Sequence, residues 1–284
     1  MTEEIDGFAF RPFGPADLEA AVELSRSSRW PHRMDDWKRL LLLGEGIAVE
    51  HQGKLIGTAL AWRFGPSWAT LGMVLVSPEF QRRGIGRHMV SLLLEDLGER
   101  SVLLHTAAGA RKLYASLGFQ AVGEIHQHQG IAQSAPIIGL APGARLRPLG
   151  RADATPLQAL DQLATGMPRD ALLERLIERG DGVVLDRDGT ALGFSFRRDF
   201  GKGQLIGPVV APDQPGAQAL IAHWVNHGVR RFVRIDVPAE SGLSEWLEAL
   251  GLQKVDTITA MVRGASLARA ESPLLWALTA QSLG

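Results

Sequence analysis

The 284-residue sequence contains no cysteine. That absence excludes disulfides, thiolate nucleophiles and cysteine-ligated zinc, and it is compatible with a reducing compartment. Basic and acidic residues nearly cancel, with 30 Lys and Arg against 31 Asp and Glu. The chain therefore has no excess positive charge to attract nucleic acid or an anionic membrane, and we expect neither partner. Any site for an anion has to be local.

Long apolar runs are also missing. No run in the sequence approaches the roughly 20 residues that span a bilayer, and the acidic start MTEEIDGFAF lacks the basic and then apolar pattern of a signal peptide. We therefore expect a cytoplasmic location. Hydrophobic residues make up 45% of the chain and charged residues 21%, which is typical of a globular protein. The length fits one large domain or two of ordinary size.

The chain contains the same pattern twice. RPFGPAD begins at Arg11 and RPLGRAD begins at Arg147, and GIAVEHQGKLIG from Gly46 matches GVVLDRDGTALG from Gly182 at the same spacing. Two further pairs follow in the same order, VLVSPE with PVVAPD and SLGFQAV with ALGLQKV. Such internal similarity indicates two tandem copies of one domain. We place them at residues 1–142 and 143–284.

The periodicity of the first copy predicts an α/β (α+β) fold, with a mixed, mostly antiparallel twisted sheet flanked by helices. The expected helices cover residues 15–27, 35–44, 85–98 and 108–118. The expected strands cover residues 8–13, 46–52, 55–64, 68–77, 101–107, 119–127 and 131–140. The end of the chain, SPLLWALTAQSLG, predicts a short apolar helix that docks on one of the domains or forms a subunit contact in a homodimer.

The stretch SPEFQRRGIGRHM, residues 77–89, joins an expected strand to an expected helix. A helix N-terminus offers unpaired N–H donors and a partial positive charge, which suit a pyrophosphate. Gly84 and Gly86 let an anion approach the backbone, and arginines stand around them. The alternative is an ordinary glycine turn with solvated arginines. A nucleotide-triphosphate loop is excluded because no Lys-Ser/Thr pair follows, and a dinucleotide loop fits poorly because the stretch follows a meander.

These motifs resemble the GNAT N-acetyltransferase superfamily. The resemblance rests on Q-x-x-G-x-G at Gln81 to Gly86, with VLVSP before it and LYASLGF after it. It implies acetyl-CoA as cosubstrate, with loop amides on its pyrophosphate and the preceding strand along its pantetheine arm. Thr106 stands near the position where the family often has an asparagine. The implied cofactor-binding residues are Met73, Val74, Leu75, Val76, Gln81, Arg82, Arg83, Gly84, Ile85, Gly86, Arg87 and Thr106.

Tyr114 is the only tyrosine in the chain. It occupies the position where the family often has its general acid, so the resemblance implies direct acetyl transfer to a primary amine, with the phenol protonating the CoA thiolate. The alternative is a packed core aromatic. The amine could belong to a small molecule or a protein, and the chemistry requires no metal.

The second copy lacks these features. Gln218 and Leu220 replace the two glycines, and Leu247 replaces the tyrosine. We therefore expect a degenerate, non-catalytic second domain, as in tandem members of the superfamily. A non-catalytic acyl-CoA sensor or a protein-interaction module is the competing hypothesis for the whole chain.

The acceptor site is predicted from two segments. SSRWPHRMDDWKRLL lies between the first two helices, where the family forms one wall of that site, and Trp30, His32, Asp36 and Trp37 could bind a cationic or aromatic acceptor. Packing and solvation are the alternatives for each of them. His126 and His128 alternate in an expected strand and so face one side. One of them could be the base, with Glu124 and His105 as rivals. A metal site is not expected here, because the sequence offers no third ligand at a suitable spacing.

Overall fold

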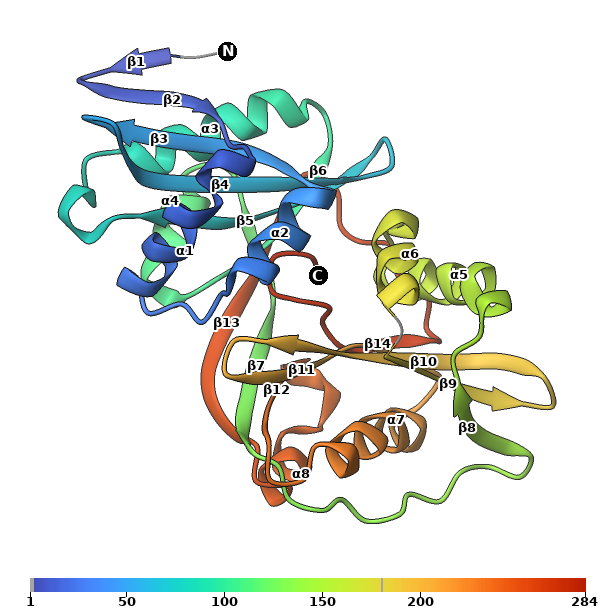
Figure 1. The fold of residues 1–284 in the computed structure, drawn as a ribbon. Coiled ribbons are helices and arrows are strands. Elements are labelled where there is room, and N and C mark those ends of the chain that lie inside the picture. The colour runs from blue at the N-terminus through green and yellow to red at the C-terminus, as the bar shows by residue number, and fades with distance from the viewer. Residues whose placement is uncertain (1–2, 180) are drawn as a thin grey trace.

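The computed structural model describes residues 3–179 and 181–284, and it contains two halves joined through one sheet (Figure 1). The first half comprises, in chain order, β1 (Glu3–Ile5), β2 (Phe8–Pro12), α1 (Leu18–Ser27), α2 (Met34–Leu43), β3 (Glu45–His51), β4 (Lys54–Phe64), β5 (Trp68–Val76), α3 (Ile85–Leu97), β6 (Ser101–Thr106), α4 (Arg111–Ala115) and β7 (Gln120–Ile131). The mixed α/β fold and its mostly antiparallel sheet confirm the predicted class.

The second half repeats this order from β2 onward. It comprises β8 (Ala144–Pro148), α5 (Ala154–Thr165), α6 (Asp170–Arg179), β9 (Gly182–Arg187), β10 (Thr190–Phe200), β11 (Gly203–Ala211), α7 (Gln214–His227), β12 (Phe232–Pro238), α8 (Ser244–Ala249), β13 (Gln253–Arg263) and β14 (Leu274–Ala277). Two predictions were wrong. Residues 132–140 form no strand, because their backbone follows the second half instead, with Gln133 N donating to Leu250 O. The expected C-terminal helix is the strand β14 followed by a loop.

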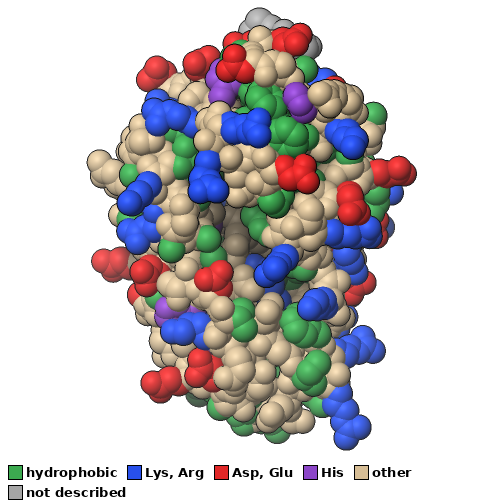
Figure 2. Space-filling view, turned by 90° about the vertical axis from the view of Figure 1, so that its left-hand side faces the viewer, with side chains coloured by type: hydrophobic (Ala, Val, Ile, Leu, Met, Phe, Trp, Pro, Cys, Tyr) green, Lys and Arg blue, Asp and Glu red, His purple; other side chains and the backbone are tan. Residues whose placement is uncertain are grey.

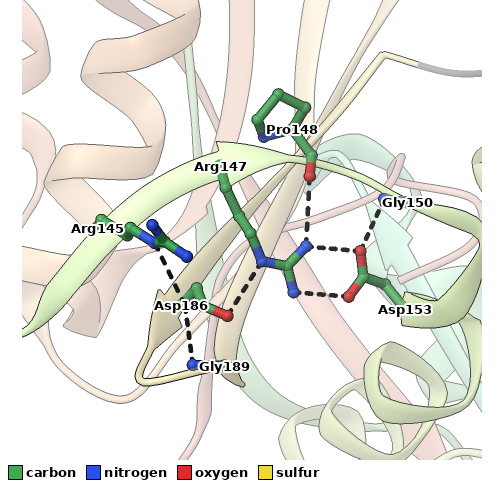
Figure 3. A network of polar contacts seen from close by, with 7 residues as sticks. All are labelled: Arg145, Arg147, Pro148, Gly150, Asp153, Asp186 and Gly189. Atoms are coloured by element: carbon green, nitrogen blue, oxygen red, sulfur yellow. Dashed lines mark hydrogen bonds and ion pairs between the residues drawn. The ribbon is translucent and has the colours of Figure 1, made fainter.

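The RPxGxAD motif builds the same salt bridge in both halves. The Arg147 guanidinium donates to both Asp153 oxygens, at 2.8 and 2.7 Å, and its Nε donates to Asp186 at 3.0 Å (Figure 3). Arg11 binds Asp17 in the same bidentate way, at 2.8 and 2.6 Å. Hydrogen bonds from Arg147 hold the pKa of Asp153 below its ordinary value. Since a forked pair fixes orientation as well as distance, the motif locks β2 to the start of α1 and β8 to the start of α5.

Two strands cross between the halves. The sheet runs β1-β2-β3-β4-β5-β6-β13-β7-β12-β11-β10-β9-β8. β13, from the second half, lies between β6 and β7, where Met261 faces Leu104 on one side and Ala121 on the other. β7, from the first half, pairs with β12 from Phe232 opposite Ile131 to Pro238 opposite Ile125. Each half therefore completes the sheet of the other.

The cores also meet across the boundary. On one face of the first-half sheet, α3 and α4 cover a cluster that includes Met89, Leu104 and Tyr114. On the other face, α1 and α2 cover a cluster around Trp37 and Trp62, and this cluster also contains Met167, Leu172 and Leu283 from the second half. A shared apolar core of this kind fixes the halves against each other.

On the surface, charges of both signs are scattered over the face drawn in Figure 2, which is hollowed near its middle.

The strand exchange predicts that residues 1–142 do not fold alone. The fragment would lack β12 and β13, so β7 would lose both of its neighbours and β6 would become an open edge. We expect the fragment to aggregate or to lack a cooperative thermal transition by circular dichroism. Co-expression with residues 143–284 should restore a 1:1 complex by size-exclusion chromatography. A monomeric 1–142 fragment that unfolds cooperatively would contradict the exchange.

Candidate functional site

The first-half sheet opens between β5 and β6. These parallel strands pair from Trp68 opposite Ser101 to Leu71 opposite Leu104, and the pairing ends there. From Gly72 to Val76, β5 keeps its β4 neighbour but has no hydrogen-bonded partner on its β6 side within the described chain. The unpaired backbone groups of this edge can bind an extended ligand as an added strand would.

A bulge produces this opening. The register of β4 against β5 shifts between Thr58 and Leu60, and Met73 has a φ of 52°, in the left-handed region. Thr58 Oγ1 donates to Met73 O at 2.9 Å and stabilises the bend. Met73 and Leu75 are buried beside α1 and α2, whereas Val74 and Val76 are half-buried on the opposite face. The backbone of the predicted residues, Met73–Val76, therefore remains available for a ligand, while the Met73 and Leu75 side chains pack in the core.

The helix α3 begins at the open end of this split with uncapped amides. Its N-cap residue is Gly84, with a φ of 83° and no side chain to accept from the first turn. A Cβ on Gly84 would meet nothing within 4 Å, and one on Gly86 would meet only Val76, at 3.7 Å. The space in front of the helix N-terminus is thus open, and its N–H groups and partial positive charge suit a phosphate.

Exposed cations surround that space. Arg82, Arg83 and Arg87 are all exposed, and Arg87 donates to Ser116 Oγ at 2.8 Å. Gln81 folds back, with its amide donating to Val76 O at 3.0 Å, so it ties the loop to the end of β5. The residues of the predicted pyrophosphate seat therefore lie together, at the N-terminus of the helix that follows the split strand.

The second half has the same split but fills it. β11 and β12 pair only from Gln204 to Ile206, and beyond that point β14 pairs with β11, with Val209 opposite Ala277 and Ala211 opposite Leu274. The helix α7 is capped as well, since Asp213 accepts from Gly216 N at 2.8 Å. The chain's own strand and carboxylate thus occupy the positions that are open in the first half.

Tyr114 lies on α4 and is 6% exposed. Its ring packs edge to face on Phe119, with ring centroids 5.9 Å apart, and burial raises the pKa of the phenol to about 12. The hydroxyl therefore stays protonated at neutral pH and can act as a proton donor. Thr106, at the end of β6, is buried and its hydroxyl donates to Ala107 O at 3.3 Å.

His105 lies near the C-terminal end of β6, on the face of the sheet opposite to Tyr114. Its Nδ1 is 2.7 Å from Gln281 O, and because a carbonyl only accepts, Nδ1 carries the proton. Burial lowers the pKa of His105 to about 4, so the ring is neutral and Nε2 keeps a lone pair. The residues Thr279–Gly284, here called the tail loop, thereby orient this imidazole.

The tail loop covers the split on the α1 and α2 side. Ser282 packs so closely on Gly72 that a Cβ there would lie 2.8 Å from Ser282 Cβ. The loop is firmly held, because Arg198 donates to Thr279 O at 3.0 Å and Arg169 donates to Leu283 O and Gly284 O at 3.0 and 2.6 Å. The C-terminal end lies between the halves (Figure 1). The second half thus forms a wall of the first-half site.

His126 and His128 do not lie at the split, which corrects the prediction that they contact the acceptor. They do face one side of β7, but that side packs on α8, where both approach Ser244 Oγ, at 2.7 and 3.1 Å. The residues that alternate with them, Ile125 and Gln127, face the tail instead, with Gln281 Nε2 donating to Gln127 at 3.2 Å. The strand exchange carries the histidines into the second half.

Trp37 is also corrected, because it is 0% exposed and its indole donates to Ser25 Oγ at 2.9 Å in the core under α1. Trp30 is 37% exposed, with its ring centroid 5.6 Å from that of His32. Asp36 caps α2 by accepting from Arg33 N at 2.9 Å.

His32 and Asp36 line one cavity of about 240 Å³ between α2, α6 and β10. The second half supplies Arg198, Phe200 and Thr279 to it. The sequence comparison missed these residues. One sequence feature could have pointed to them, because the repeat aligns Arg198 with the core residue Trp62 and so places a charge where the first copy is apolar.

Outside residues 1, 2 and 180, no group of three or more His, Cys, Asp or Glu side chains has the arrangement of a metal site. Over the same ranges, no helix is long and apolar enough to cross a membrane.

Comparison with known families identifies the class. Residues 14–119 match the model of the acetyltransferase (GNAT) family, and residues 157–276 match that of an acetyltransferase (GNAT) domain. The chain belongs to the GNAT superfamily and contains two GNAT domains in tandem. Members of this family typically use acetyl-CoA, and the open split, the uncapped helix and the surrounding arginines fit that cosubstrate.

Several relatives share the whole arrangement. The chain is 26% identical over 273 residues to the uncharacterized N-acetyltransferase YitH of Bacillus subtilis, covering 94% of this chain and 95% of that one. A putative acetyltransferase from Pyrococcus horikoshii superposes with a TM-score of 0.81 at 19% identity, covering 99% and 98% of the two chains. A tandem GNAT protein from the clavulanic acid biosynthesis pathway superposes with a TM-score of 0.64 at 16% identity, covering 91% and 99%.

The open space at the α3 N-terminus predicts the effect of adding side chains there. Gly86→Val should weaken CoA binding about tenfold or more by isothermal calorimetry, because its Cβ projects toward Val76 at the split. Gly84→Val should do the same, with some added backbone strain. Gly53→Val is the matched control, since Gly53 also has a positive φ, 73°, and open space around it, in the β3–β4 turn. Equal CoA affinity in all three variants would remove the basis for this site.

Proposed function

We propose that the protein is an acetyl-CoA-dependent N-acetyltransferase whose single active site lies in the first half. The observation that carries the proposal is the contrast between the two splits, one open in front of an uncapped helix and the other filled by β14. Acetyl-CoA would supply an activated acetyl thioester at the open split. The residues from Met73 to Val76 would bind its pantetheine arm through their backbone, and residues 81–87 would bind its pyrophosphate.

The reaction is a direct transfer to a primary amine. The neutral amine attacks the thioester carbonyl, the C–N bond forms as the C–S bond breaks, and CoA leaves as a thiolate that needs a proton. Tyr114 would supply that proton, since burial keeps its phenol protonated. The position of this lone tyrosine in the family motif supports the acid role, and packing against Phe119 is the alternative.

His105 would accept the proton that the amine loses. It stands at the mouth of the split on the face of α1 and α2, and its Nε2 lone pair is fixed by the Nδ1 bond to Gln281 O. Its pKa of about 4 keeps the imidazole neutral, with the lone pair free, but makes it a weak base. His126 and His128 face α8 and have no comparable position. Glu124 is exposed and lines a second cavity together with His105, so it remains the alternative base.

The competing hypothesis is a non-catalytic acyl-CoA sensor. A sensor would have the same CoA site but would need no site for an acceptor. The cavity beside the split could hold an acceptor, so it favours the enzyme. The second domain would be structural and would contribute walls to the acceptor side.

Tyr114→Phe should lower kcat by about 10²-fold, because general-acid catalysis contributes at least that much. Its CoA affinity by calorimetry should be unchanged, since phenylalanine fills the same space. Turnover can be followed by release of the CoA thiol, because the chain has no cysteine of its own. Full kcat in the variant would assign Tyr114 to packing alone.

Two substitutions at His105 separate its nitrogens. His105→Asn keeps a donor near the Nδ1 position for Gln281 O but removes the Nε2 base, and we expect kcat to fall about 10²-fold with little change in melting temperature. His105→Gln removes the donor to the tail loop and should also lower stability. If His105→Asn retains the wild-type kcat, His105 is not the base.

A further inference from the structure

The cavity between α2, α6 and β10 contains a cluster of buried polar atoms without partners in the described chain. They are His32 Nδ1, Asp36 Oδ1, Arg39 Nε, Arg197 Nε and Thr279 Oγ1, and all five residues line the cavity. Asp36 is 3% exposed and Thr279 is 1% exposed. Because burying a polar group without a partner is costly, such a cluster in one cavity indicates a polar ligand.

The lining has a surplus of positive charge. Five arginines face three aspartates there, in a chain whose net charge is −1. Arg197 is paired with Asp181 at 2.8 Å and Arg175 with Glu178 at 2.9 Å, whereas Arg39 and Arg198 have no carboxylate within hydrogen-bond distance in the described part of the chain. Asp36 Oδ1 lies 3.7 Å from the Arg39 guanidinium and 3.9 Å from that of Arg198, beyond hydrogen-bond distance of both. His32 adds no charge, because burial and the nearby Arg234 and Arg198 lower its pKa to about 3.

Arg198 has the most unusual position. Of its N–H donors, one binds Thr279 O at 3.0 Å, and its guanidinium lies 5.3 Å from the centre of the Phe200 ring. Burial lowers its pKa to about 10; the charges of Arg39 and Arg234 act in the same direction, and that of Asp36 opposes them. The repeat places Arg198 where the first half has Trp62, a fully buried core residue. A charged residue at a position that is apolar in the other copy breaks the usual rule that cores are apolar, and such exceptions are expected at functional sites.

The cavity and the split lie on either side of the tail loop. Ser282 and Leu40 line the cavity, Ser282 packs on Gly72 where β5 leaves β6, and Leu40 O accepts from the indole of Trp62 at 2.9 Å. At about 240 Å³, the cavity is smaller than the roughly 300–1,000 Å³ typical of drug-sized ligands. It suits a molecule of the size of an amino acid.

We propose that this cavity binds the acyl acceptor and that the acceptor carries a carboxylate near its amine, held by the guanidinium groups of Arg198 and Arg39. The planar fork of arginine matches a carboxylate, while Asp36 Oδ1 and Thr279 Oγ1 are left for N–H or O–H donors of the same molecule. The inference rests on the proposed function and replaces the cationic or aromatic acceptor predicted from the sequence. It makes free amino acids the substrate class.

The test compares amine acceptors with a carboxylate, an amide, a phosphate or an aromatic ring. Acetyl-CoA turnover is measured with the L-amino acids, with their α-amides, and with phosphoethanolamine and phenylethylamine. Calorimetry on CoA-loaded protein gives the affinity for the same amino acids without turnover. We expect amino acids to exceed their amides at least 100-fold in kcat/KM.

The variants assign that preference to the cavity. Arg198→Met and Arg39→Met should each raise the KM for the amino acid by about 10- to 100-fold at unchanged CoA affinity, as loss of a charge-assisted hydrogen bond predicts. Arg198→Lys should lie between, because it keeps the charge but loses the fork. Arg187→Met, at an exposed position on β9, is the control and should stay within twofold.

The outcomes separate the inference from the proposed function. Equal use of amides, phosphoethanolamine or phenylethylamine overturns the inference, as does a KM within twofold in both arginine-to-methionine variants. CoA binding with no amino acid either bound or acetylated also overturns it, while the CoA site stands. If an amino acid binds in an Arg198-dependent way but acetyl-CoA does not bind, the cavity's ligand is supported and the proposed acyl transfer fails.

Discussion

The hydrogen bonds that β13 makes with β6 and β7 are the constraint on which the rest of the molecule depends. Because β13 belongs to the second half and β7 to the first, neither half has a complete sheet without the other. The exchange fixes the two halves face to face. It thereby brings α2 of one against α6 and β10 of the other, with Met167, Leu172 and Leu283 packed into the first-half core, so the cavity beside the split is a consequence of the pairing.

The two halves show how one fold can keep or lose a ligand site. Both contain parallel strands that stop pairing midway, at Leu71 in β5 and at Ile206 in β11. In the first half the exposed edge and the uncapped α3 remain open to a ligand. In the second half β14 takes the edge and Asp213 takes the first amides of α7. Unpaired backbone in a core is unfavourable, and in the second half these replacements satisfy the groups that the split would leave unpaired.

Much of this arrangement could be predicted from the sequence, because its signals are local. The duplicated RPxGxAD motif forms the same bidentate pair twice, and QRRGIG forms the uncapped turn that its glycines indicate. The strand exchange could not be predicted, because the alternation of side chains along residues 253–263 indicates a strand but not which strands it pairs with. The histidines of β7 were misplaced for that reason. The acceptor wall was missed because Arg198 and the tail loop reach the site only through the tertiary arrangement of the halves.

The close contact between Gly72 and Ser282 decides which strand can supply chemistry to the acceptor side. Gly72 is the residue of β5 that faces this side where the strands part, and a side chain there would collide with Ser282, whose Cα and Cβ would lie 3.1 and 2.8 Å from its Cβ. Position 72 of β5 therefore provides backbone alone, and a proton acceptor on this side has to come from another element. His105 meets that requirement, and its orientation depends on Gln281 of the same loop. The tail loop thus closes one position to a side chain and orients His105, which gives the second domain a part in the proposed reaction.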